Sequence, residues 1–161
     1  MCTNKVYFLY SNVNVLLFLL MLYFAKKILH FLTSNSRHGT HSPFVYSLAE
    51  QIIYSRKNKR NKESLQAAIV RYFEKQGYTQ EQFCTLSLID YTVEELVALQ
   101  EKYFMLFVEL PHRHASEPLW QQLQRDSRFV VLIDLFELGI ICKRKEQRKE
   151  YFKLRYPYWL Y

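Results

Sequence analysis

The apolar residues in the first half of the chain predict a series of helices. Residues 6–25 form an uncharged and mostly apolar run that ends at Lys26 and Lys27. Further on, apolar residues recur at helical spacing over residues 43–55 and again over residues 64–76. A serine suited to capping a helix stands at or just before the start of each of these two stretches. The first half is therefore expected to be helical.

The second half alternates between strand and helix patterns. Residues 83–90 alternate as a half-buried strand does, and residues 103–110 form the continuous apolar run of a buried strand. Thr92 and Glu95 have the spacing of a capping box, so a helix should begin between the two strands. A second helix is expected over residues 117–126.

The last apolar segment, residues 128–145, predicts a hairpin that turns near Gly139, and residues 150–156 are expected to add an edge strand. The order of strands and helices is typical of βαβ units in a parallel sheet. We therefore expect an α/β fold in which residues 1–36 form an N-terminal apolar helix and residues 37–161 form the domain.

Two stretches of the chain resemble a group of bacterial class I S-adenosylmethionine-dependent methyltransferases known from Bacteroidetes. RHGTHSPFVYSLAEQIIY (37–54) resembles the segment that precedes the family's catalytic sheet, and residues 117–156, which include IDLFELGII, resemble the end of its domain. SLQAAIVRYF resembles the helix that leads into the family's first strand, and TLSLID and YFMLFVELPH resemble its fourth and fifth strands. The resemblance implies a reduced Rossmann-like, methyltransferase-type sheet with a C-terminal antiparallel hairpin, preceded by N-terminal helices.

The family's cofactor-binding segment has no counterpart in this chain. In the family, a glycine-rich turn after the first strand lets the backbone approach the cofactor, and an acid after the second strand holds the ribose. Here only EKQGYTQEQFCT (74–85) separates the leading helix from TLSLID, and Gly77 is its one glycine. A further βαβαβ unit cannot fit into this stretch, because each of its crossovers alone needs about a dozen residues.

The resemblance thus implies a vestigial or non-catalytic methyltransferase-like protein that lacks the cofactor-binding half. No cofactor is expected, and no cofactor-binding residue can be assigned. The alternative is an active enzyme in which a partner or a second copy of the chain, as in a homo-oligomer, completes the site for S-adenosylmethionine.

Few side chains stand out as candidates for catalysis or metal binding. Asp90 follows a predicted strand, at the position where α/β sheets place ligand contacts, although a turn residue fits equally well there. His38 and His41 form one histidine pair, and His112 and His114 form another. They would bind a metal only if their two loops met in space. No nucleophile-elbow motif is present.

The net charge of +7 is concentrated in residues 56–62 and 143–155. A second alternative function is a basic binding module that uses these clusters on a membrane or on nucleic acid, but solvated loops and strand edges explain the clusters as well. Nucleic-acid binding is not expected, because no RNA-recognition motif, zinc finger or clear helix-turn-helix is present. The three cysteines are widely spaced, which argues against a disulfide framework.

The apolar run from Val6 to Ala25 is long enough to cross a bilayer as a helix. Positive charge is denser after this segment than before it, so the positive-inside rule predicts a cytoplasmic domain anchored to the inner membrane. Two alternatives remain open. The helix can pack on a core or a membrane surface, or residues 1–20 can be a gene-model extension upstream of a start at Met21.

Overall fold

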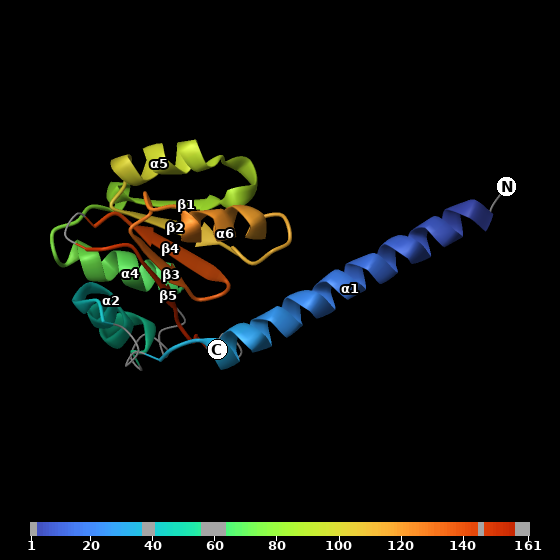
Figure 1. The fold of residues 1–161 in the computed structure, drawn as a ribbon, viewed down its shortest axis with the longest axis horizontal. Coiled ribbons are helices and arrows are strands. Elements are labelled where there is room, and N and C mark those ends of the chain that lie inside the picture. Colours follow the sequence, from blue (N-terminus) through green and yellow to red (C-terminus); the bar gives the residue numbers. More distant parts are fainter. Residues whose placement is uncertain (1–2, 37–40, 56–63, 145–146, 157–161) are drawn as a thin grey trace.

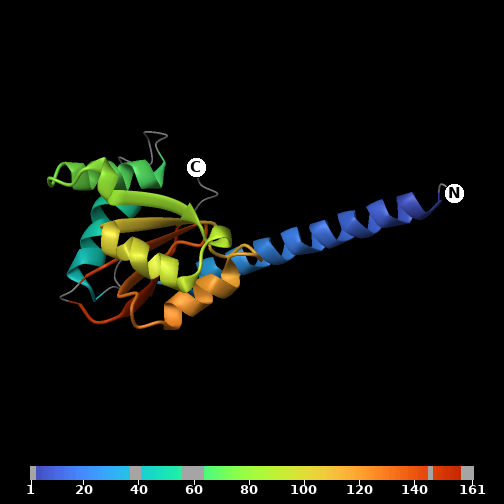
Figure 2. The same ribbon diagram turned by 90° about the horizontal axis from the view of Figure 1, so that it is seen from above.

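The computed structural model describes residues 3–36, 41–55, 64–144 and 147–156, and within the first helix it describes the side chains of residue 15 and of residues 17 onward. A five-stranded sheet lies between two layers of helices, and a long helix, α1 (Thr3–Thr33), projects away from this body (Figures 1 and 2). The basic run at residues 56–62 lies outside the described residues.

Four of the five strands run in the same direction. The strands are β1 (Phe83–Ser87), β2 (Met105–Glu109), β3 (Val131–Asp134), β4 (Leu138–Cys142) and β5 (Glu150–Lys153), and their order in the sheet is β1-β2-β4-β3-β5. The pairs β1–β2 and β3–β5 are parallel, whereas β4 is antiparallel to both β2 and β3. This mixed, open α/β sheet is Rossmann-like in coarse outline, as expected from the order of elements.

The helices begin where the capping residues predict. They are α2 (Pro43–Leu48), continued by the π-helical η2 (Ala49–Ile53), then α4 (Leu65–Glu74), α5 (Val93–Lys102) and α6 (Glu117–Arg125). The side chains of Ser42 and Ser64 accept hydrogen bonds from the third backbone N–H that follows each of them, and Thr92 and Glu95 form a complete capping box. Short 3₁₀ turns, η3 (Gln80–Gln82) and η4 (Leu88–Asp90), flank β1.

The sheet has an apolar core on each face. On one face Phe107 and Ile140 pack with α2, η2 and α4, and on the other Leu106 and Ile141 pack with α5 and α6. Neighbouring residues of β2 and β4 therefore serve opposite cores, because side chains alternate across a strand. Burial on both faces explains why these strands read as unbroken apolar runs.

The predicted hairpin is confirmed, but its turn lies just before Gly139. Residues 135–137 make the turn, and Gly139 lies inside β4. Phe136 takes the positive φ of 75° that the turn requires. Gly139 instead allows a close approach, since a Cβ at this position would lie 2.7 Å from the indole ring of Trp120.

The two edges of the sheet differ. Next to β5, residue Asn35 forms an isolated parallel bridge with Leu154, so this edge is partly covered. Within the described residues no strand pairs with the outer side of β1. The predicted strand over residues 83–90 is also shorter than expected, because Leu88–Asp90 turn into η4.

Helix α1 contains the predicted membrane segment and exposes many apolar side chains. Its exposed large apolar residues are Val15, Leu17, Phe18, Leu19, Leu20, Met21, Leu22, Phe24, Ile28, Leu29 and Leu32. No helix in the part of the chain that the structure describes combines the length and the hydropathy needed to cross a membrane.

Candidate functional site

A buried carboxylate lies where α1 meets the sheet. Asp134 is the last residue of β3, and its side chain is fully buried. Because β2 and β3 run in the same direction, their carboxyl ends lie at the same edge of the sheet, where open α/β folds place their ligands. The turn that follows β2 and the end of α1 reach Asp134 at this edge.

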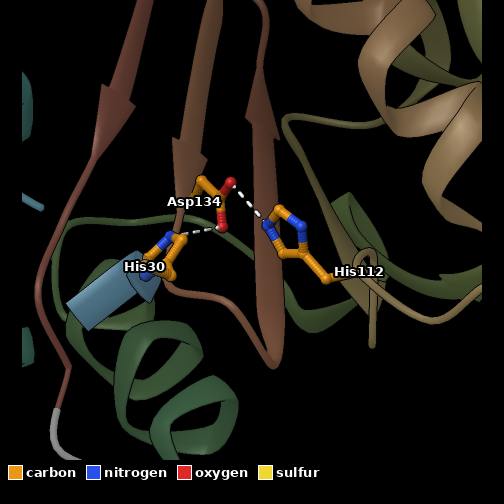
Figure 3. A group of neighbouring side chains, drawn as sticks. All are labelled: His30, His112 and Asp134. Atoms are coloured by element: carbon orange, nitrogen blue, oxygen red, sulfur yellow. Dashed lines mark hydrogen bonds and ion pairs between the residues drawn. The ribbon is translucent and has the colours of Figure 1, made fainter. Parts of the chain in front are cut away.

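Two histidines face the Asp134 carboxylate from opposite sides (Figure 3). Nε2 of His30, on the last part of α1, lies 3.1 Å from Oδ1. Nε2 of His112, in the turn after β2, lies 2.8 Å from Oδ2. The two imidazole rings are themselves 5.5 Å apart between centroids. The cluster of His30, His112 and Asp134 therefore joins three separate parts of the chain.

Three further donors hold the carboxylate in place. The backbone N–H of Phe136 donates to Oδ1 over 2.9 Å, and the indole N–H of Trp120 donates to Oδ2 over 3.3 Å. The hydroxyl of Tyr151, on β5, also donates to Oδ2. These groups come from the β3–β4 turn, from α6 and from β5, so the orientation of Asp134 is fixed by elements on every side of it.

Ionised Asp134 is strongly favoured in this setting. Burial alone would raise the pKa of Asp134, but the hydrogen bonds and positive charge of His112 and His30 outweigh burial and hold that pKa well below its ordinary value. The same carboxylate acts on its neighbour in the opposite sense. Burial first, and then the charge of Asp134, raise the pKa of Tyr151, which therefore remains a neutral hydrogen-bond donor.

The second ring nitrogen of His30 contacts Ser34. The Ser34 hydroxyl donates its single hydrogen to the backbone carbonyl of His30 and lies 3.0 Å from Nδ1 of the same residue. The donor in the contact between Ser34 and Nδ1 depends on the ring tautomer. A hydrogen on Nε2 allows His30 to donate to the Asp134 carboxylate.

His112 forms the outer side of the cluster. Its ring stacks on Phe136, with 4.8 Å between ring centroids and 8° between planes. Its Nδ1 lies 4.0 Å from a carboxylate oxygen of Glu117, and its side chain is 15% exposed. His30 and Asp134 lie behind it, with side chains 5% and 0% exposed. Solvent thus approaches the cluster on the side of His112.

Two ion pairs hold α1 against the domain. Lys26 pairs with Glu117, and Lys27 pairs with Glu137. The Arg155 guanidinium donates to the carbonyl of Ser34 over 3.2 Å, just beyond the end of the helix. The candidate site therefore lies at the contact between α1 and the domain, and this contact sets the direction of α1.

The structure distributes the predicted site residues differently from the sequence-based expectation. Asp90 is exposed at the end of η4, and His41 and His114 are exposed as well. His38 lies outside the described residues. Of the predicted histidines, His112 alone joins a cluster of potential metal ligands in the described part of the chain, and its partners there are His30 and Asp134.

The sequence-based prediction did not include Asp134 or His30, although the sequence contains a signal for each of them. Asp134 interrupts the apolar run VVLIDLF, where an acid is costly unless the fold supplies partners for it. His30 likewise stands within ILHFL. Neither pattern identifies the partner, because His30 and Asp134 are 104 positions apart.

The fold and the site together define a protein with an open α/β sheet, in which a buried cluster of one aspartate and two histidines connects the projecting helix α1 to the sheet. No family model, no curated protein and no solved structure matches the chain.

Proposed function

We propose that this chain is a non-catalytic, methyltransferase-like domain that α1 attaches to a membrane. The order of elements after α4 supports the first part of the proposal. It runs strand, helix, strand, helix and antiparallel hairpin, which agrees with the order that the resemblance to class I methyltransferases implies. The stretch that resembles the family's fourth strand overlaps the end of β1, and the stretch that resembles its fifth strand contains β2.

The non-catalytic assignment rests on the short connection from α4 to β1. Helix α4 ends at Glu74 and β1 begins at Phe83, so only residues 75–82 lie between them, and three of these form η3. In the resembling family, the strand and glycine-rich turn that approach the cofactor belong at this point. A crossover to further strands needs about a dozen residues, so this connection has no room for a nucleoside-binding half-sheet.

The apolar surface of α1 supports attachment to lipid. Six consecutive residues, 17–22, are large, apolar and exposed. Successive residues of a helix are about 100° apart, so six in a row face every direction around the axis. A protein groove would cover one side of such a helix, whereas acyl chains cover all sides. Lys26 and Lys27 then mark the point where α1 meets the domain.

Calorimetry with S-adenosylmethionine tests the non-catalytic assignment. We expect no binding heat from the full chain in detergent micelles, that is, a Kd weaker than about 1 mM, at low and at high protein concentration. S-adenosylhomocysteine provides a second probe of the same cleft. Micromolar affinity for either compound would contradict the assignment, and affinity that appears only at high protein concentration would favour an enzyme completed by a second copy.

A further inference from the structure

We propose that His30, His112 and Asp134 form a binding site for one divalent transition-metal ion of the Zn²⁺ type. This proposal is independent of the proposed function, because it rests on the side chains at the carboxyl edge of the sheet. Two imidazoles and one carboxylate are a ligand set suited to Zn²⁺, Co²⁺, Ni²⁺ or Fe²⁺. Each histidine would contribute its Nε2 atom, the atom that already faces the carboxylate (Figure 3).

The spacing of the ligand atoms supports this assignment. One ligand atom from each of the three residues lies within 4.8 Å of the others. The two nitrogen–oxygen separations are 3.1 Å and 2.8 Å. Metal–ligand bonds of about 2.0–2.2 Å place adjacent ligand atoms roughly 3 Å apart or slightly more. Small side-chain rotations would therefore suffice to bring all three residues onto one ion.

Two of the three ligands that would hold the ion already have supporting contacts. Nδ1 of His30 lies 3.0 Å from the Ser34 hydroxyl, which leaves Nε2 as the nitrogen available for a metal. Trp120, Tyr151 and the backbone of Phe136 orient the Asp134 carboxylate. Hydrogen bonds of this kind fix the tautomer of a ligating histidine and the direction of a ligating carboxylate.

The electrostatics of the cluster supply a second argument. Five polar groups surround the Asp134 carboxylate: His30, His112, Trp120, Tyr151 and the Phe136 amide. A carboxylate has about four lone-pair sites that can accept hydrogen bonds, which is fewer than the five groups that surround Asp134. One metal ion in place of the two histidine protons would leave three donors and one cation on the carboxylate.

The position of the ion would give it a structural consequence. His30 belongs to α1, whereas His112 and Asp134 belong to the domain. A bound ion would therefore tie α1 to the sheet and hold the helix in one direction. The partly exposed side at His112 leaves a coordination position for water or another small ligand.

Titration of the metal-stripped full chain with Co²⁺ tests the site, because Co²⁺ absorbs visibly in a way that depends on its ligands. We expect one equivalent to bind with micromolar or tighter Kd and Zn²⁺ to displace it. His112→Gln should weaken binding at least tenfold. His114→Gln and His41→Gln are matched controls, since both histidines are exposed and outside the cluster, and they should bind as the wild type does.

Two outcomes would overturn the proposal. If the wild-type chain does not bind stoichiometric Co²⁺ or Zn²⁺, the cluster only forms hydrogen bonds between α1 and the domain and is not a metal site. Equal losses in the His112, His114 and His41 variants would indicate adventitious surface binding. If His112→Gln does not fold, X-ray absorption on the metal-loaded wild type decides: two imidazoles on the ion support the site, and fewer than two contradict it.

Discussion

Replacing Asp134 with asparagine should lower the free energy of unfolding by about 3–5 kcal/mol, the usual cost of breaking a buried ion pair. Asparagine has nearly the same shape, but it carries no charge and has one acceptor oxygen. Its amide group would then face some of the donors that Asp134 now satisfies, among them His30, His112 and Tyr151. Each buried donor left without an acceptor adds to the loss.

The same variant should also loosen α1 from the domain. Chemical denaturation measures the loss of stability, and distances between spin labels at Ala25, which is exposed on α1, and on an exposed helix of the domain report the docking of α1. Asp90→Asn is the matched control, because Asp90 is exposed and the substitution should change stability by about 0.5 kcal/mol or less. Equal stability of Asp134→Asn and the wild type would show that the cluster contributes little to the fold.

The double variant Leu20→Asp/Phe24→Asp should reduce binding to lipid vesicles at least a hundredfold. The two residues are four positions apart on α1, and both are exposed. Transfer of each side chain out of water is worth about 1.5–3 kcal/mol, so their loss costs about 3–6 kcal/mol, and each 1.4 kcal/mol corresponds to a factor of ten. Flotation with vesicles that contain phosphatidylethanolamine and phosphatidylglycerol measures the effect.

A variant on the domain distinguishes lipid binding by α1 from lipid binding by any exposed apolar side chain. Ile89 is 61% exposed in η4, away from α1 in sequence, and Ile89→Asp should float as the wild type does. If the double variant also floats normally, α1 is not the attachment element. If high salt, rather than the α1 substitutions, releases the protein, the basic clusters provide the binding instead.

Local signals predicted most of the fold, because capping and apolar period act within a few residues. Ser64 and the Thr92–Glu95 pair placed the starts of α4 and α5 correctly. The hairpin turn was located only approximately because β3 and β4 are buried on both faces, so no change of period marks the turn. Glycine is the usual turn residue, yet Gly139 is required here by the packing of Trp120.

Most of the candidate site could not be predicted from sequence patterns. His112 was identified as a ligand candidate, but with the wrong partners, because histidine spacing within a loop says nothing about which loops meet. His30 reaches Asp134 only after α1, β2 and β3 have taken their places at one edge of the sheet. A polar residue within an apolar run was the available signal, and it indicates that a partner exists without identifying it.

Native-state hydrogen exchange on the full chain tests most directly the proposal that the sheet lacks further strands beside β1. β1 pairs with β2 on one side, so alternate amides of β1 point outward. We predict that these outward amides exchange much faster than those of β4, which lies inside the sheet, and that S-adenosylmethionine leaves the pattern unchanged. Uniform slow exchange along β1, as along β4, would mean that further strands complete the sheet and would contradict the account of a methyltransferase-like domain without its cofactor-binding half.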